Sequence, residues 1–270
     1  MPMNMRRKNR APKTVRDRLR IRAADDNLVP AVFVSNGSDK LVILSHGIST
    51  GKEEDGIYTE FAENVLSPSF DSVRFDFRGH GESAMDSRQV TVAGEILDFM
   101  AVVRWARERH YSKLFHLGTS FGASITLLSV SSFDLRDFSA VVFWNPVISY
   151  RNTFICASVP WGREFFNQKS TVELAYRKGT RIPETDFTIG PCMTMELLNL
   201  HPEAAAWPIG VPLLVIHGDR DTCVPHSDAH DYCARNRGAR LLTLKGVDHG
   251  FDDSISCAYR ETLEWFTRNA

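Results

Sequence analysis

Short apolar runs recur along the chain, and segments long enough for a helix separate them. This alternation limits the fold more than any other feature of the sequence. Each run holds three to five residues; the runs lie at 41–44, 73–75, 113–117, 140–143, 213–216 and 241–244. Continuous runs of this kind are typical of strands buried on both faces of a sheet. We therefore expect an α/β fold, with a mostly parallel central sheet, right-handed crossovers and flanking helices.

The segments between the runs include clear helical patterns. In the segment 91–109 the apolar residues recur every three or four positions: Ile96, Phe99, Met100, Val103 and Ala106. A second pattern of this kind, at 256–268, predicts the closing helix. At the other end of the chain, residues 19–34 predict a hairpin with its turn at 25–27, where Asp and Asn favour side-chain-to-backbone turn bonds.

One region, residues 148–207, breaks the alternation. It holds eight aromatic residues: Tyr150, Phe154, Trp161, Phe165, Phe166, Tyr176, Phe187 and Trp207. An unstructured connection of this length is unusual within a compact domain. We therefore predict a core built from 19–147 and 208–270, and a small inserted cap over 148–207 that ends in a helix near 193–206. The aromatic residues either line a substrate pocket or form the cap's own small core.

Charge is unevenly distributed. The chain of 270 residues is 43% hydrophobic and has a net charge of −1, which argues against a nucleic-acid binder. Residues 1–22 hold nine Lys or Arg and one acid, which leaves 23 basic and 32 acidic side chains, or −9, in the remainder. We predict that residues 1–18 form a basic arm, either a solvated extension or a contact for an acidic partner such as an acyl carrier protein.

Cysteine and hydropathy patterns bear on location. The five cysteines are an odd number, widely spaced and without a C-x-x-C pair, which argues against a disulfide framework and against a zinc knuckle. No apolar stretch reaches the roughly 18 residues of a spanning helix, and no apolar segment follows the basic start as in a secretory signal. These features favour a cytoplasmic protein without a membrane span.

The pentapeptide Gly-Thr-Ser-Phe-Gly at 118–122 lies directly between a predicted strand and a predicted helix. In such an elbow the central residue is strained and its small neighbours allow close packing, so the Ser120 hydroxyl should project above the sheet edge. The N-terminus of the following helix favours negative charge there. Ser120 is therefore the candidate nucleophile.

A serine hydroxyl needs a base, and the base needs a carboxylate that fixes its tautomer. His249 follows the run 241–244, and two carboxylates, Asp219 and Asp221, follow the run 213–216. Because the carboxyl ends of parallel strands share one edge, these loops can meet Ser120 there. We favour Asp221 over Asp219, because the loop must extend beyond the strand before a side chain reaches the imidazole. Asp248 is expected to form a turn.

Acyl transfer also needs donors for the oxyanion. The backbone N–H of Phe121, directly after the nucleophile, can supply one, and that of Ile48, in the turn after the first long strand, can supply the other. His46 is expected to hold this turn by hydrogen bonds. The pair His226 and His230, four residues apart, has the spacing of metal ligands, but a solvated helix face is the simpler interpretation. We predict neither metal nor cofactor.

Taken together, these motifs resemble the α/β-hydrolase superfamily over nearly the whole chain, from residue 19 to residue 266. The stretch 75–83 (Phe-Asp-Phe-Arg-Gly-His-Gly-Glu-Ser) resembles the superfamily's D-x-R-G-x-G-x-S loop, which implies a mainly structural role for Asp76 and Arg78. With the His46-Gly47 pair and the modest cap, the chain is similar to the serine aminopeptidase/acylglycerol lipase-like group. That group includes feruloyl and cinnamoyl esterases and acyl thioesterases.

The resemblance implies the same roles that the residues indicate: Ser120 as nucleophile, Asp221 as acid, His249 as base, and Ile48 and Phe121 as oxyanion donors. The expected activity is cleavage of a small-molecule carboxylic ester through an acyl-enzyme intermediate. The alternatives are a thioesterase or acyltransferase for carrier-bound acyl groups, a peptidase, and a non-catalytic ligand receptor on the same scaffold.

Overall fold

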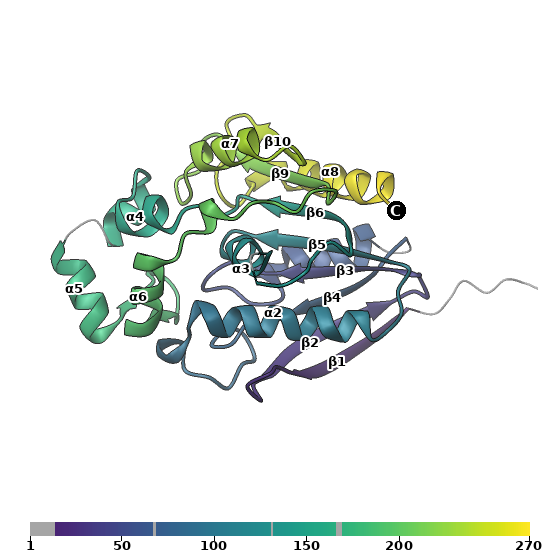
Figure 1. Ribbon diagram of the computed structural model, residues 1–270, viewed down its shortest axis with the longest axis horizontal. Helices are drawn as coiled ribbons and strands as arrows, with labels where there is room; N and C mark the ends of the chain where they lie inside the picture. The colour runs from purple at the N-terminus through teal and green to yellow at the C-terminus, as the bar shows by residue number, and fades with distance from the viewer. Residues whose placement is uncertain (1–13, 67–68, 131, 166–168) are drawn as a thin grey trace, which may run out of the picture.

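The computed structural model describes residues 14–66, 69–130, 132–165 and 169–270, and Figure 1 shows one central sheet with helices on both sides. Its eight described strands lie in the order β1-β2-β4-β3-β5-β6-β9-β10. Their bounds are β1 (Val15–Arg22), β2 (Leu28–Ser35), β3 (Lys40–Ser45), β4 (Asp71–Phe75), β5 (Lys113–Thr119), β6 (Phe138–Trp144), β9 (Leu213–Gly218) and β10 (Ala239–Leu244). From β4 to β10 neighbouring strands are parallel, and the β1–β2 hairpin joins β4 antiparallel. The predicted fold class is confirmed.

Side chains alternate between the two faces of the sheet, as the pleat of a strand requires. In β3, Leu41 and Ile43 join one apolar cluster, whereas Val42 and Leu44 join the other. Helices α2, α3 and α7 pack on the first cluster, and α1, η2 and α8 pack on the second. Their bounds are α1 (Ile57–Glu60), η2 (Phe61–Leu66), α2 (Val92–Arg107), α3 (Phe121–Val130), α7 (His226–Arg235) and α8 (Ile255–Arg268).

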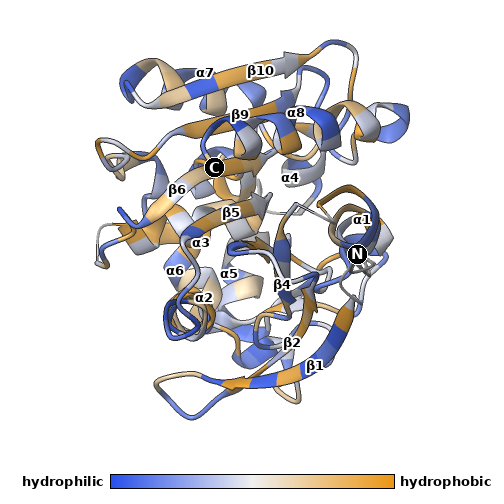
Figure 2. Cartoon of the chain, turned by 90° about the vertical axis from the view of Figure 1, so that its right-hand side faces the viewer, coloured by the Kyte–Doolittle hydropathy of each residue, from blue (hydrophilic) through white to orange (hydrophobic). Residues whose placement is uncertain are grey.

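The structure corrects the boundary of the predicted basic arm. β1 begins at Val15 and pairs with β2 from Val15 opposite Ser35 to Arg22 opposite Leu28, so residues 15–18 belong to the hairpin. The polar side chains of this edge strand are exposed, and Figure 2 shows it alternating between blue and orange. Residues 1–13 of the arm lie outside the described residues. None of the described helices is long and apolar enough to cross a membrane.

The segment between β6 and β9, for which the sequence predicts a cap, consists of short elements. They are η4 (Arg151–Ile155), α4 (Pro160–Phe165), α5 (Lys169–Lys178), β7 (Thr180–Arg181), β8 (Thr188–Ile189), α6 (Pro191–Asn199) and η5 (Pro202–Ala204). The helix expected near 193–206 is α6, which ends at Asn199. Pro202, which lacks an N–H to donate, starts the separate 3₁₀ turn η5 instead.

Contacts from the cap to the core set its position over the sheet edge. The carboxylate of Glu196 accepts a 2.6 Å hydrogen bond from the N–H of Val92, at the start of α2. The Trp161 N–H donates to the carbonyl of Thr222, 3.1 Å away, in the loop after β9. The ring of Phe187 stacks on His80 with centroids 4.3 Å apart. The cap is therefore attached to the core at three separate elements.

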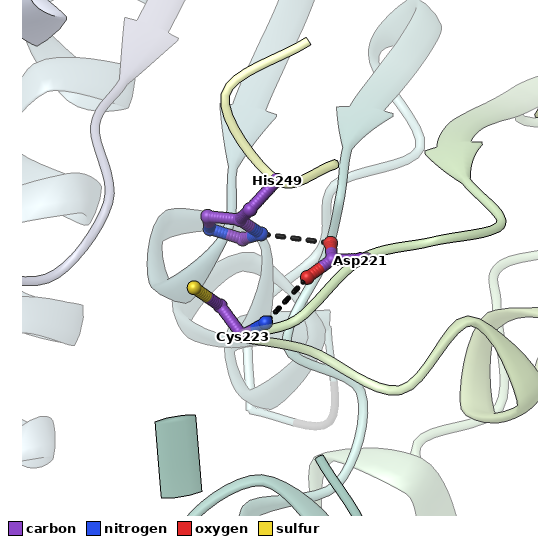
Figure 3. A group of neighbouring side chains, drawn as sticks. All are labelled: Asp221, Cys223 and His249. Carbon is purple, nitrogen blue, oxygen red and sulfur yellow. Dashed lines mark hydrogen bonds and ion pairs between the residues drawn. The ribbon is translucent and has the colours of Figure 1, made fainter. Parts of the chain in front are cut away.

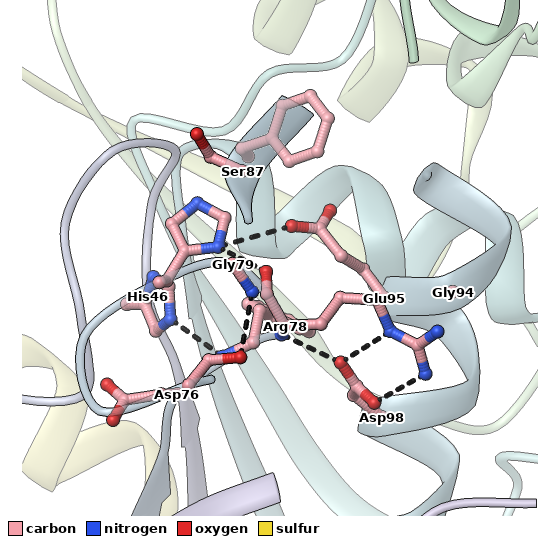
Figure 4. A network of polar contacts seen from close by, with 12 residues as sticks. His46, Asp76, Arg78, Gly79, Ser87, Gly94, Glu95 and Asp98 are labelled. Atoms are coloured by element: carbon pink, nitrogen blue, oxygen red, sulfur yellow. Dashed lines mark hydrogen bonds and ion pairs between the residues drawn. The ribbon is translucent and has the colours of Figure 1, made fainter. Parts of the chain in front are cut away.

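A buried polar network holds the loop after β4 (Figure 4). The guanidinium of Arg78 contacts Asp98 at 2.8 Å and Asp25 at 2.7 Å. Asp76 accepts the backbone N–H and the Nζ–H of Lys52, both at 2.7 Å. Because Asp76 and Arg78 lie in the interior and face these partners, both fix the loop that packs against the turn after β3.

Candidate active site

Three loops, one after each of β5, β9 and β10, bring Ser120, Asp221 and His249 together. The Nε2 atom of His249 lies 3.2 Å from Oγ of Ser120, and Nδ1 lies 2.8 Å from Oδ2 of Asp221. Figure 3 shows the imidazole facing this carboxylate. A neutral His249 that donates from Nδ1 to Asp221 presents the lone pair of Nε2 to the serine hydroxyl. The three residues thus form one continuous chain of hydrogen bonds.

The elbow that carries Ser120 is strained and tightly packed. Its φ of 49° lies in the left-handed region, which costs a residue with a side chain about 1–3 kcal/mol. The Ser120 N–H donates to the carbonyl of Trp144 at 2.9 Å, and the Val147 N–H donates to the Ser120 carbonyl at 3.0 Å. At Gly122 a Cβ atom would lie 2.5 Å from the carbonyl oxygen of His46. Glycine at this position therefore lets α3 approach the turn after β3.

Asp221 accepts four hydrogen bonds that fix both of its oxygens. Oδ1 accepts the N–H groups of Cys223 at 2.8 Å and Val224 at 2.7 Å. Oδ2 accepts from His249 and from Nε2 of His217, which lies 3.0 Å away. Burial alone would raise the pKa of Asp221, but the charge of His249 and the hydrogen bonds from both histidines outweigh it and hold the pKa well below its usual value. The carboxylate is therefore charged.

The competing carboxylate, Asp219, turns away from the imidazole. It accepts the Gly246 N–H at 2.7 Å and lies 3.0 Å from Nζ of Lys245. Asp248 also turns away, because its carboxylate accepts the backbone N–H of Thr222 at 2.8 Å. These two residues join the loops after β9 and β10. The carboxylate of Asp248 accepts the backbone N–H of His249 at 2.7 Å, whereas that of Asp221 contacts its imidazole.

His249 is held by its backbone as well as by its ring. The side-chain amide of Asn145 donates to the carbonyl of His249, and the Asn145 oxygen accepts the N–H of Gly218 at 3.0 Å. Burial alone would lower the pKa of His249, but the charge and hydrogen bond of Asp221 raise it above the ordinary value of 6.5. The imidazole is therefore a stronger base than a free histidine side chain.

The sequence predicts two main-chain oxyanion donors, Ile48 and Phe121. Within the described residues, the N–H groups of Ile48 and Phe121 donate to neither backbone nor side-chain acceptors. Gly47 lies against the nucleophile, since a Cβ atom there would be 3.2 Å from that of Ser120. His46 supports this turn as predicted: its Nε2 accepts the Phe77 N–H at 3.0 Å, and its Nδ1 lies 2.7 Å from the Gly47 carbonyl.

Comparison with known families agrees with this architecture. The family model described as serine aminopeptidase S33 matches residues 36–185, more than half of the chain. The chain belongs to this family. The matched region of this S33 hydrolase includes Ser120 and the turn after β3, whereas Asp221 and His249 lie beyond it. No curated protein matches the sequence.

Solved structures share the α/β-hydrolase fold of this S33 hydrolase at low sequence identity. Est1E from Butyrivibrio proteoclasticus, solved with ferulic acid, has a TM-score of 0.75 and 18% identity over 92% of this chain and 98% of its own. The Pyrococcus furiosus esterase Pf2001 has a TM-score of 0.70 and 21% identity over 94% and 92%. The esterase EaEST from Exiguobacterium antarcticum has a TM-score of 0.70 and 16% identity over 92% and 98%.

A pocket of about 270 Å³ opens beside Ser120 of the S33 hydrolase. The loops after β3, β5, β9 and β10 line it together with the cap. Of the eight cap aromatics, Phe154 and Trp161 are among the described lining residues. Phe154 is also buried in the large apolar cluster, together with Tyr150, Phe187 and Trp207. Phe166 lies outside the described residues. The first interpretation therefore applies to Phe154 and Trp161, whereas the buried cap aromatics extend the main core and do not form a separate one.

Two site residues were not predicted from the sequence. His217, at the end of β9, is fully buried and donates to Asp221, so that two imidazoles share one carboxylate oxygen. Glu54, nine residues beyond the end of β3, is buried and lines the pocket. A histidine-glycine pair at a strand end is the only sequence signal for His217. Glu54 lies within an acidic run that resembles a solvated surface, which gives no signal.

The described residues include one group of potential metal ligands. Ligand atoms of Asp221, Cys223 and His249 all lie within 4.8 Å of one another. Burial and the charge of Asp221 raise the pKa of the Cys223 thiol to about 11, so the sulfur is protonated near neutral pH and is a weak ligand. The other pair, His226 and His230, makes separate contacts, to Thr243 at 2.8 Å and Asp231 at 3.1 Å.

Proposed function

We propose that this S33-family protein is a serine esterase that hydrolyses a carboxylic ester through an acyl-enzyme intermediate and needs no cofactor. The observation that supports this most directly is the position of His249, whose two nitrogens lie within hydrogen-bond distance of Ser120 and of Asp221. This arrangement matches the requirements of nucleophile, base and orienting carboxylate.

In the first half of the reaction, Oγ of Ser120 attacks the carbonyl carbon of the ester while Nε2 of His249 takes the hydroxyl proton. The charge of Asp221 stabilises the imidazolium that forms. The carbonyl oxygen becomes an oxyanion, which accepts hydrogen bonds from the free N–H groups of Ile48 and Phe121. When the bond to the alcohol breaks, His249 returns the proton to the departing oxygen, and the acyl group remains on Ser120.

The second half repeats these steps with water. His249 removes a proton from a water molecule as its oxygen attacks the acyl carbon, and a second oxyanion forms against the same donors. Collapse of this intermediate breaks the bond to Oγ, His249 returns the proton to Ser120, and the carboxylic acid leaves. The same residues therefore serve both halves.

The shape of the pocket favours a small or medium acyl group. A volume of about 270 Å³ is at the low end for ligand sites, and aromatic side chains form much of its wall: Trp144, Phe154, Trp161 and Phe251. The described lining residues include two carboxyl groups and neither Lys nor Arg, which disfavours anionic substrates. Because the similarly folded Est1E was solved with ferulic acid, hydroxycinnamate esters belong in the first substrate panel.

Replacing the nucleophile tests the proposal. Ser120→Ala should abolish both hydrolysis of a chromogenic ester and labelling by a fluorophosphonate probe, because no hydroxyl remains beside His249. Ser132→Ala is the matched control, since Ser132 is exposed and lies outside the pocket. Thermal unfolding of both variants establishes that they fold. Labelling that persists in folded Ser120→Ala would remove this serine from the mechanism.

A thioesterase for carrier-bound acyl groups remains the second hypothesis from the sequence. Its main support is the basic arm, and residues 1–13 of the arm lie outside the described residues. Matched oxygen esters and thioesters of the same acyl group, assayed with the full chain and with a chain that lacks residues 1–13, separate the two activities. If the shortened chain loses activity on carrier-linked thioesters but keeps its activity on oxygen esters, the result would favour the thioesterase.

A further inference from the structure

Glu54 is a buried carboxyl group inside the candidate site. It is 9% exposed, lines the pocket, and lies close enough to His249 to raise the pKa of that residue. Its neighbours in the acidic run differ: Glu53 pairs with Arg74, and Asp55 is exposed. Because an acidic side chain is costly to bury, a fold that turns one of three adjacent carboxyls inward needs a compensating set of contacts.

The backbone around Glu54 is strained in a way that directs it inward. Glu54 has a φ of 44°, Asp55 of 52° and Gly56 of 94°, so three consecutive residues in η1 (Glu54–Gly56) are left-handed. Two of these carry side chains, for which this region is unfavourable. Strain of this kind persists only where the surrounding structure over-determines it, and it concentrates at functional sites.

The carboxyl group of Glu54 holds the turn that carries an oxyanion donor. Its Oε2 accepts the N–H of Gly47 at 2.9 Å and the hydroxyl of Thr50 at 2.9 Å. The single proton of the Thr50 hydroxyl can go either to this oxygen or to the Gly47 carbonyl, 3.1 Å away. The Nδ1–H of His46 donates to that carbonyl at 2.7 Å. The N–H of Gly47 is therefore held by Glu54 and its carbonyl by His46.

Together these contacts set the direction of the Ile48 N–H. Glu54 holds the peptide unit before Gly47, and His46 holds the oxygen of the unit after it, which also carries the Ile48 N–H on its opposite side. Glycine has a wide choice of backbone angles, so both units must be held before the second takes a fixed direction relative to the first. The Ile48 donor therefore depends on the side chains around the turn for its orientation.

We propose that Glu54 is a positioning residue of the oxyanion hole: it clamps Gly47 and thereby aims the Ile48 N–H at the oxygen of the tetrahedral intermediate. The inference rests on the proposed esterase function. It assigns to Glu54 the role of hydrogen-bond acceptor, which the carbonyl oxygen of a glutamine can also fulfil.

The acceptor role distinguishes two substitutions at this position. Glu54→Gln keeps an oxygen for Gly47 and Thr50, so kcat should stay within about threefold of wild type. Glu54→Leu has similar size but no acceptor, and it should lower kcat by about 10²–10³, the effect of losing one oxyanion donor. KM should change little in either variant, because the oxyanion forms only after binding. Glu60→Gln, on the exposed face of α1, is the charge-matched control.

A transition-state analogue gives a second measurement. A trifluoromethyl ketone adds to Ser120 as a tetrahedral oxyanion, whereas an unreactive ketone of the same shape does not. Affinity for the trifluoromethyl ketone should fall in Glu54→Leu by about the same factor as kcat, and affinity for the unreactive ketone should stay constant. If Glu54 had only a structural role, Glu54→Leu would lower the affinity for both ketones by the same factor, and that result would overturn the proposal.

Other results with these variants would also contradict the proposal. Folded Glu54→Leu with wild-type kcat would overturn it, and so would Glu54→Gln that is as impaired as Glu54→Leu. If Glu54→Leu does not fold, Thr50→Val decides: losing one donor to the clamp should lower kcat by about two- to tenfold at constant KM, and an unchanged kcat would contradict the role. A wild-type protein that neither hydrolyses esters nor reacts with a fluorophosphonate refutes the esterase itself, whatever the variants do.

Discussion

Asp221→Asn tests how the carboxylate orients the imidazole, because backbone N–H groups fix which side-chain atom of the asparagine faces His249. The N–H groups of Cys223 and Val224 both donate to Oδ1, so this position must remain an oxygen. The new NH₂ group then takes the place of Oδ2 and faces His249 and His217. A donor opposite Nδ1 of His249 stabilises the tautomer that carries its proton on Nε2, and that tautomer cannot accept the proton of Ser120.

The expected loss is large. With the wrong tautomer favoured, kcat should fall by about 10⁴, which corresponds to about 5 kcal/mol in the activation free energy. The assay is hydrolysis of a chromogenic ester at pH 8 under saturating and single-turnover conditions, with circular dichroism as the check on folding. KM should change much less than kcat, because Asp221 is not exposed to the pocket.

Asp219→Asn is the matched control, since it makes the same chemical change two residues away. Asp219 contacts Gly246 and Lys245 and makes no contact with His249, so its variant should keep kcat within about threefold. Folded Asp221→Asn that retains more than about a tenth of the wild-type kcat would refute the argument from the tautomer. An Asp219→Asn variant as impaired as Asp221→Asn would show that the acid was wrongly assigned.

The remaining predictions concern pH and packing. Because Asp221 raises the pKa of His249 above 6.5, and the imidazole must be neutral to accept a proton, kcat/KM should fall with decreasing pH through a pKa above 6.5; an acid limb at or below that value contradicts the assignment. Gly122→Ala places a Cβ atom 2.5 Å from the His46 carbonyl oxygen and should lower the free energy of unfolding by about 1–3 kcal/mol in urea titrations. Gly250→Ala, which meets no atom within 4 Å, should change it by less than about 0.5 kcal/mol, and equal effects of the two would count against the packing argument.

The sheet could be predicted because its strands are buried on both faces. The runs at 41–44 and 213–216 lie within β3 and β9, and the flanking helices follow from apolar residues at helical spacing. Burial favours apolar residues at the spacing of a strand or of a helix, and that spacing can be read directly from a sequence. The limit of the basic arm was not predictable in this way, because β1 is an edge strand whose exposed arginines resemble those of a solvated extension.

The placement of Ser120, Asp221 and His249 could also be predicted, because the ends of parallel strands meet at one edge. Their catalytic roles stay predictions until the variants are measured. Glu54 could not be found in the sequence, since its burial depends on positive φ angles at three consecutive residues, and backbone angles of this kind have no signature in an acidic run. The pocket-lining cap residues were equally hidden, because loop packing decides which aromatics face inward.

The positive φ angles are concentrated around the pocket. Of the ten described residues other than glycine with positive φ, five line it: Ser49, Glu54, Asp55, Ser120 and Phe251. Each such residue stores conformational energy that the sheet and helices must offset. A core substitution far from the pocket that loosens the packing should therefore first change the conformation of these strained residues. We therefore expect such a substitution to lower kcat before it lowers the melting temperature.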